Sequence, residues 1–202
     1  MSRSQHEKIL ALFDFDGTIT KKDSFLVFIQ YYVGSLKFWI GFLQLSPWVI
    51  AFKIGIINNH KFKEKVLKHF FKGQPVTDFK QKADYFSKYI IPTLIRPKAL
   101  ERLQMHKQSK YYICIVSASL EDYLSAWAKA EGFGLIATRL VKENNQITGR
   151  IAGKNCHGFA KVELIHQKYS LSGFVKIYAY GDTLSDLPML FLAQDRHYKP
   201  FR

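Results

Sequence analysis

The chain has 202 residues, of which 48% are hydrophobic and 15% aromatic, a composition that excludes a disordered protein and suits one well-buried domain with a sizeable insertion. Its two cysteines, Cys114 and Cys156, are too few for a disulfide scaffold, and Cys114 lies in an apolar run where we expect inert packing. The net charge of +14 is concentrated in segment 21–110, which carries 17 Lys or Arg and 5 Asp or Glu. Such a basic segment favours an anionic partner. The alternative is a solvated lysine-rich helical face without a partner.

Apolar runs and turn signals predict the elements of the first half of the chain. Ile9–Phe13 is a continuous apolar run, typical of a buried parallel strand, and it ends at Asp14. The segment 24–87 then predicts helices that are rich in Phe, Tyr, Trp and Lys, with breaks at prolines such as Pro47 and Pro92.

The second half of the chain alternates apolar strands with amphipathic helices, and a stretch around Asn144–Asn145 has the alternation of a hairpin. Strands that alternate with helices imply an open, mostly parallel sheet, with ligands bound beyond the carboxyl ends of the strands. The predicted elements are a strand at 111–116, a helix from about 120, a strand at 135–137, the hairpin at 139–151, a helix at 159–169 and a strand at 175–180.

Carboxylates and a hydroxyl stand where three of the predicted parallel strands end. Asp14 and Asp16 follow the first strand, Ser117 ends the second, and Asp182 and Asp186 follow the last. Oxygen-rich sites of this kind suit Mg²⁺, which takes a few carboxylates, several waters and a substrate phosphate. A carboxylate can also attack phosphorus, while a second carboxyl group protonates the leaving oxygen and then activates water. A lysine and a hydroxyl would offset the charge of the transferring phosphoryl group.

Four motifs in this order resemble those of the haloacid dehalogenase (HAD) superfamily, and the resemblance covers nearly the whole chain. It implies an α/β fold with a Rossmann-like three-layer parallel-sheet core and a helical cap inserted between the first and second motifs. The motifs are Asp14–Thr18 (DxDGT), Val116–Ser117 (a hydroxyl residue ending a strand), Lys161 (a lysine opening a helix) and Gly181–Asp186 (GDxxxD).

The resemblance implies catalytic roles for four residues. Asp14 is the nucleophile and Asp16 the general acid/base, and Ser117 and Lys161 hold the substrate phosphate. Thr18 is a further substrate-side residue that would bond the nucleophile region, with a simple turn hydroxyl as the alternative. Ser117 would otherwise be the N-cap of the helix that follows it.

The resemblance also implies a Mg²⁺ site. Its ligands would be Asp14, the backbone carbonyl of Asp16, and Asp182, and Asp186 would hold a metal-bound water or the lysine. Lys154 stays open as the alternative to Lys161, because it lies seven residues earlier in the chain.

The long helical segment between the first two motifs resembles the cap of subfamily IB, the branch that contains phosphoserine phosphatase. We therefore predict a catalytic core at 1–20 and 108–202 and a cap at 21–107. Gly17 stands where phosphoserine phosphatases usually carry Ser, and Asp23 stands near their substrate-binding Glu. These two departures count against phosphoserine as the substrate.

The cap contains an apolar segment, Leu36–Ile57, whose length approaches that of a membrane span. Charged residues and Pro47 interrupt it, so two shorter helices are predicted in its place. These helices would form the buried core of the cap or press an apolar face into an anionic membrane surface. The second pattern resembles phosphatidylglycerophosphatase C-type members of the same branch.

The sequence thus predicts a Mg²⁺-dependent phosphatase that hydrolyses a phosphomonoester, a small metabolite or a lipid headgroup phosphate, through an aspartyl-phosphate intermediate. The alternative is a non-catalytic basic protein that binds nucleic acid or an anionic membrane; no nucleic-acid module is recognisable, so nucleic acid is not the expected partner. Residues 1–8 lack the apolar core of a signal peptide, so we expect a cytoplasmic protein, with peripheral attachment to the inner face of the membrane as the alternative.

Overall fold

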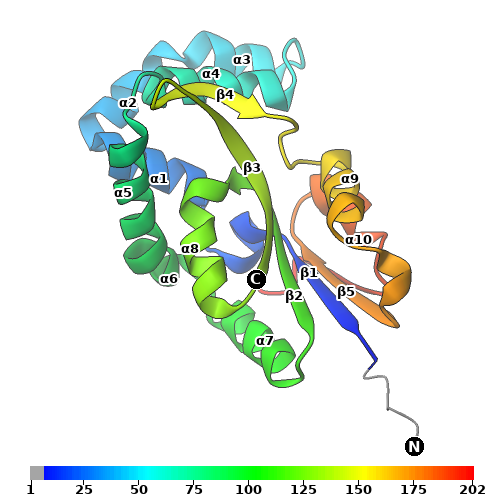
Figure 1. Ribbon diagram of the computed structural model, residues 1–202. Coiled ribbons are helices and arrows are strands. Elements are labelled where there is room, and N and C mark those ends of the chain that lie inside the picture. Colours follow the sequence, from blue (N-terminus) through cyan, green and yellow to red (C-terminus); the bar gives the residue numbers. More distant parts are fainter. Residues whose placement is uncertain (1–6) are drawn as a thin grey trace, which may run out of the picture.

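A mostly parallel sheet forms the centre of the molecule in the computed structural model, which describes residues 7–202 (Figure 1). Residues 1–6, part of the predicted core segment 1–20 and of the polar stretch 1–8, lie outside the described range. The strand order is β4-β3-β2-β1-β5-β6, and every neighbouring pair is parallel except β3 with β4. The strands are β1 Ile9–Phe13, β2 Tyr112–Leu120, β3 Gly134–Glu143, β4 Gln146–Ala152, β5 Lys176–Gly181 and β6 Asp195–Tyr198.

Helices cover both faces of the sheet, which gives the predicted three-layer α/β core (Figure 1). Ala11 and Phe13 belong to the apolar cluster on one face, whereas Leu10 and Leu12 belong to the cluster on the other. Both faces of β1 are therefore buried, which is why this strand is an unbroken apolar run. The flanking helices are α7 Pro97–Gln108 and α8 Glu121–Glu131 on the first face, and α9 Phe159–Lys168 and α10 Leu187–Leu190 on the second.

A helical insertion follows β1 and returns to the sheet beside its own starting point. Lys21 donates its backbone N–H to the carbonyl of Leu94, and Arg96 donates to the carbonyl of Ile19, both at 2.8 Å. The division into a core at 1–20 and 108–202 and a cap at 21–107 stays a prediction, and α7, although inside 21–107, packs on β2. The helices of the insertion are α1 Ser24–Val33, α2 Ser35–Gln44, α3 Ser46–Lys53, α4 Asn59–Phe71, α5 Val76–Tyr85 and α6 Ile91–Leu94, with a wide turn, Phe86–Ile90, before α6.

The β3–β4 hairpin leaves the sheet and packs against the insertion. A Cβ on Gly149 of β4 would lie 2.6 Å from the Cα of Lys68, so only glycine allows β4 to approach α4 this closely. Three backbone hydrogen bonds join the α4–α5 connection to the start of β4: Gly73 N to Ile147 O (2.8 Å), Ile147 N to Gln74 O (2.9 Å) and Val76 N to Asn145 O (2.9 Å).

The observed strands extend beyond the predicted ones. β2 continues to Leu120 because a register shift after Ser117 allows Leu120 to pair with Thr138. The predicted strand at 135–137 and the first arm of the hairpin form one continuous strand, β3. β6 was not predicted, because the strand has only four residues, two of which are charged, and none of them is fully buried.

The apolar segment of the insertion forms two helices, α2 and α3, as its composition predicted. Within residues 7–202 no single helix is both long and apolar enough to cross a membrane. α1 and α2 reach the required length and composition only as a pair, and this pair bends by 115°. Phe28 and Ile29 of α1 are fully buried in the insertion.

Candidate active site

Asp14 lies at the centre of the carboxyl edge of the sheet, directly after β1. Its backbone N–H donates to the carbonyl of Tyr180 at 2.9 Å, which continues the pairing of β1 with β5 by one residue. The buried carboxylate accepts two hydrogen bonds, from Lys161 Nζ to Oδ1 (2.6 Å) and from Thr18 Oγ1 to Oδ2 (2.8 Å). Both oxygens of Asp14 therefore have fixed positions.

The turn after Asp14 depends on Gly17. Its φ is +80°, a value that L side chains rarely adopt, and a Cβ there would lie 2.5 Å from Oδ2 of Asp182. Glycine thus lets the β1 turn touch the loop that follows β5. This contact brings Thr18 and Asp182 to the same side of Asp14.

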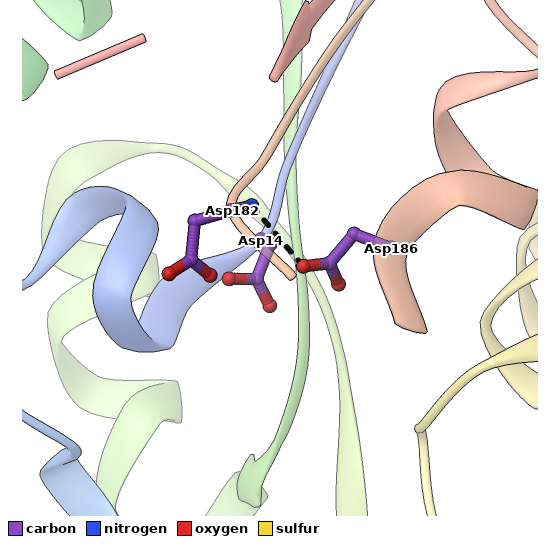
Figure 2. A group of neighbouring side chains, drawn as sticks. All are labelled: Asp14, Asp182 and Asp186. Carbon is purple, nitrogen blue, oxygen red and sulfur yellow. Dashed lines mark hydrogen bonds between the residues drawn. The ribbon is translucent and has the colours of Figure 1, made fainter. Parts of the chain in front are cut away.

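Asp182 and Asp186 follow β5 and meet Asp14 in one buried group (Figure 2). Asp186 Oδ1 accepts a hydrogen bond from Lys161 Nζ at 2.6 Å, so the lysine bridges Asp14 and Asp186. Asp186 Oδ2 accepts from the backbone N–H groups of Asp182 (3.2 Å) and Thr183 (3.0 Å), which fixes the loop.

Burial and charge act against each other in this group. Burial raises the pKa of Asp14 to about 7, although Lys161 acts to lower it. Burial also acts to raise the pKa of Asp186, but Lys161 and the hydrogen bonds from Thr183 outweigh it and hold this pKa below its ordinary value. Burial disfavours the charged form of Lys161, yet Asp14 and Asp186 raise its pKa, so Lys161 stays protonated.

These carboxylates fit a divalent cation. Asp14, Asp182 and Asp186 each offer an oxygen, and the three oxygens lie within 4.8 Å of one another. A buried group of carboxylate oxygens with one lysine is rich in negative charge, which a hard cation such as Mg²⁺ would offset. In the structure the guanidinium of Arg202 pairs with Asp182.

The carboxylate of Asp16 lies apart from this group. Its Oδ1 accepts from the backbone N–H of Ser24 at 2.6 Å, and its Oδ2 accepts from the hydroxyls of Ser119 (2.5 Å) and Ser117 (3.4 Å). The side chain of Asp16 is therefore free of Lys161 and is held toward the insertion. A separate position of this kind suits a proton donor rather than a second metal carboxylate.

Ser117, the predicted phosphate ligand, is fully buried at the register shift of β2. Its Oγ accepts the backbone N–H of Ser119 at 2.9 Å, and Ser119 lines the pocket. Sequence reasoning did not assign a role to Ser119. The repeated hydroxyl in Ser117-Ala-Ser119 is the signal that marks it.

Lys161, and not Lys154, reaches the carboxylates. Lys154 pairs with Glu163 at the surface, whereas Lys161 opens α9 and is almost completely buried. The structure therefore brings together Asp14, Thr18, Lys161, Asp182 and Asp186, with Asp16 and Ser117 adjoining them.

A pocket with a volume of about 500 Å³ opens above the carboxylates, between the sheet and the insertion. Its floor is polar, and most of its wall is apolar and comes from the insertion: Phe25, Leu26, Phe42, Val49, Phe52, Phe62 and Val66.

One cation of the insertion reaches the pocket, on α4. Lys63 donates to the carbonyl of Ala118 and lies 4.7 Å from the centre of the Phe25 ring. Burial lowers the pKa of Lys63 to about 8, against the opposing effect of Asp16 and Asp23. Sequence reasoning missed Lys63, because nothing distinguishes it from the other lysines of α4.

Comparison with known proteins identifies the family. A sequence model of the haloacid dehalogenase-like hydrolases matches residues 11–190. The chain belongs to this family. The HAD family assignment extends from β1 to α10 and so includes all four predicted motifs.

Two curated relatives of this HAD chain differ in how much of it they cover. Protein CicA of Caulobacter vibrioides is 34% identical over 200 residues, which are 98% of this chain and 88% of CicA. A probable phosphatase of Mycobacterium tuberculosis is 33% identical over 104 residues, which are 50% of this chain and 36% of that protein.

Solved structures share the HAD fold. A Bordetella pertussis protein of unknown function superposes with a TM-score of 0.79 at 21% identity, covering 93% of this chain and 87% of that one. A substrate-bound phosphoserine phosphatase gives a TM-score of 0.69 at 19% identity, covering 96% and 87%. The fold is thus that of the phosphoserine phosphatase-like branch, as the motifs and the helical insertion predicted.

Proposed function

We propose that the protein is a Mg²⁺-dependent phosphatase that hydrolyses a phosphomonoester through an aspartyl-phosphate on Asp14. The observation that carries this proposal is the buried group in which Lys161 bridges Asp14 and Asp186. A lysine beside a carboxylate nucleophile would offset the charge on the phosphoryl oxygens as the bond to phosphorus forms. A protein that used its basic helices only for binding would have no use for this buried group.

In the first step, an oxygen of Asp14 bonds to phosphorus as the bond to the leaving oxygen breaks, and Asp16 gives that oxygen its proton. In the second step, Asp16 takes a proton from a water whose oxygen attacks phosphorus, and the bond to Asp14 breaks. Inorganic phosphate leaves, and Asp16 is again protonated. The contacts of Thr18 with Asp14 and of Ser119 with Asp16 hold both acids in place for these steps.

The proposed metal ligands are Asp14, Asp182 and the backbone carbonyl of Asp16, with Asp186 holding a metal-bound water or Lys161. When bound, Mg²⁺ supplies positive charge at the phosphoryl oxygens. Ser119 lines the pocket where a hydroxyl would contact the phosphate, and Ser117, the proposed phosphate ligand, lies directly beneath it and contacts Asp16. Lys161 holds the nucleophile and would donate to a phosphoryl oxygen.

The pocket supports a leaving group that is partly apolar. Its wall carries aromatic and aliphatic side chains from the insertion, and Lys63 adds one positive charge near Asp23. Such a wall suits a lipid headgroup phosphate or an apolar metabolite phosphate better than phosphoserine. Asp23 itself caps α1, accepting the backbone N–H of Leu26 at 3.0 Å.

A phosphomonoester panel assayed with Mg²⁺ and with EDTA tests this proposal. It would include p-nitrophenyl phosphate, phosphoserine, soluble apolar phosphates and phosphomonoester lipids in detergent. We expect turnover that EDTA abolishes and that Asp14→Asn removes. Turnover that survives Asp14→Asn, or that is indifferent to chelation, would contradict the mechanism. In burst experiments, Asp16→Asn should still form the phosphoenzyme from p-nitrophenyl phosphate, whose leaving group needs no proton.

A further inference from the structure

The insertion exposes an apolar stripe along the outer side of α2. Leu36, Trp39 and Leu43 are 75%, 67% and 74% exposed, and Ile40 lies between them. These four residues follow the i, i+3, i+4, i+7 spacing of one helix face. The opposite side of α2 is also apolar, but it is buried in the insertion through residues such as Phe38. α2 is therefore apolar on two faces, and the fold uses one of them.

α3 and the turn that follows it continue this exposed surface. Every side chain of α3 lies within the described residues, and none of them is fully buried. Ile50, Ile54 and Ile56 are 59%, 65% and 72% exposed. We call the set Leu36, Trp39, Ile40, Leu43, Ile50, Ile54 and Ile56 the α2–α3 surface. The helices α2 and α3 themselves lie at the outer edge of the insertion, away from β1 and β5 (Figure 1).

An exposed apolar surface of this extent on a folded chain marks an interaction site. The charge around it indicates the partner. The sequence carries no Asp or Glu between Asp23 and Glu64, whereas it carries Lys37, Lys53 and Lys61 there, all exposed. The one acidic residue beside Trp48 and Lys61 in the described structure is Glu64, and it pairs with Lys68. The border of the α2–α3 surface is therefore net basic, which is complementary to an anionic surface.

Two tryptophans support a lipid surface rather than a protein one. Trp39 lies on the α2–α3 surface, and Trp48 of α3 is stacked under Lys65, whose Nζ is 4.1 Å from the centre of its ring. Tryptophan rings are enriched at the boundary between headgroups and acyl chains, and lysines beside them attract acidic headgroups. Apolar side chains, tryptophans and lysines together are the pattern of an interfacial helix.

The inner sides of the same helices line the pocket. Phe42 of α2 and Val49 and Phe52 of α3 face the space above Asp14. A surface that docks α2 and α3 would therefore lie directly beside the pocket wall. Because Phe28 and Ile29 of α1 are buried in the insertion, α1 and α2 cannot span a bilayer together without unfolding it.

We propose that the α2–α3 surface docks on the surface of an anionic lipid bilayer, with the apolar side chains of α2 and α3 inserted among the headgroups and the lysines at the border contacting acidic lipids. The docking itself does not depend on turnover, so it stands apart from the phosphatase proposal.

Vesicle co-sedimentation of the full chain tests this proposal. The vesicles would be phosphatidylcholine alone and phosphatidylcholine mixed with phosphatidylglycerol. We expect binding to the mixed vesicles at low salt, weaker binding at high salt and little binding to phosphatidylcholine alone. The double variant Trp39→Glu with Leu43→Glu should weaken binding about tenfold or more. Asp14→Asn should bind as the wild type does, which separates docking from catalysis.

A matched control is the double variant Leu100→Glu with Val175→Glu, which places the same charges on exposed apolar positions away from the insertion. It should bind vesicles as the wild type does, and thermal unfolding would show that both double variants are folded. Equal binding of wild type and the Trp39, Leu43 variant would overturn the proposal, as would failure of the wild type to bind at low salt. A wild-type dimer that becomes a monomer in this variant, without vesicle binding, would instead assign the surface to a second copy of the chain.

Discussion

At the scale of single residues, Lys161 connects two carboxylates to which the proposed chemistry gives different roles, Asp14 as the nucleophile and Asp186 as a supporting group. Lys161 acts to lower the pKa of Asp14 against the larger opposite effect of burial, and it fixes Asp186 at the other side of the site. The two buried carboxylates need this cation, because removal of the lysine would leave them close together with no positive charge between them.

We predict that Lys161→Ala lowers kcat by about 10²–10³-fold, because the charge that offsets the phosphoryl oxygens is lost. Steady-state kinetics on p-nitrophenyl phosphate with Mg²⁺ would measure this. Lys154→Ala is the matched control, since Lys154 lies in the connection before α9 and pairs with Glu163 at the surface. It should keep wild-type kcat, and a similar loss in both variants would contradict the assignment of the third motif to Lys161.

Gly17 gives a second prediction, for which Gly132 is the control. Both glycines have φ near +80°, but a Cβ on Gly17 would meet Asp182, whereas a Cβ on Gly132 would meet nothing within 4 Å. Each change to Ala should cost about 1–2 kcal/mol in unfolding free energy for the left-handed backbone. Gly17→Ala should in addition displace Asp182 and abolish Mg²⁺-dependent turnover. Urea unfolding and activity of both variants would check this, and full activity of Gly17→Ala would refute it.

At the scale of elements, β1, β2 and β5 could be predicted from sequence because the central part of each is largely buried and carries an apolar run, at 9–13, 112–116 and 177–180. Because the carboxyl ends of these parallel strands share one edge of the sheet, the sequence also predicts that Asp14, Ser117 and Asp182 lie close together. β6 could not be predicted, since a half-buried edge strand of only four residues, Asp-Arg-His-Tyr, is too short for a periodic apolar signal.

The parts of the site that come from the insertion could not be predicted either. Lys63 reaches the pocket only because α4 packs beside β4 with one particular face inward, and that face depends on contacts between distant segments. The same limit applies to α2. The composition of α2 predicted an apolar helix. Because α2 is apolar on two faces, the sequence alone does not predict which face is buried in the insertion.

The packing of α7 against β5 gives a prediction about acid stability. His106 of α7 is fully buried, and its Nε2 shares a hydrogen bond of 2.8 Å with the hydroxyl of Tyr180. Burial, with a contribution from Arg102, lowers the pKa of His106 to about 4. Below a pH of about 6.5 the unfolded chain takes up a proton that the folded chain does not bind until about pH 4. Stability is therefore lost as the pH falls through this window.

We expect His106 to account for about 2 kcal/mol of the unfolding free energy lost between pH 7 and pH 5. Urea unfolding of the wild type and of His106→Gln at both pH values would measure it, because groups such as Asp14 contribute equally to both proteins. The variant should lose less stability than the wild type on acidification. Parallel losses would show that His106 does not control acid sensitivity.

At the scale of the whole molecule, the carboxylate group joins segments from opposite ends of the chain, since Asp14 follows β1 and Asp182 follows β5. A ligand that binds both must stabilise the fold as a unit. We predict that Mg²⁺ at about a hundredfold excess over its Kd raises the unfolding free energy by about 2.7 kcal/mol. Thermal unfolding with Mg²⁺ and with EDTA would show this as a shift in Tm. Asp182→Asn should remove the shift, and an equal shift in that variant would place the ion elsewhere.

The three backbone hydrogen bonds between the α4–α5 connection and β4 have a consequence for the rate at which ligands exchange. A swing of the whole insertion about its paired ends at Thr20 and Ile95 would break all three at once, together with the contact of Glu64 with the backbone N–H of Ile151. α3 is held far less tightly, since its described side chains include none that is fully buried. We therefore expect entry and release of ligands to follow local movement of α2 and α3, so that whatever binds their outer side also sets the speed of product release.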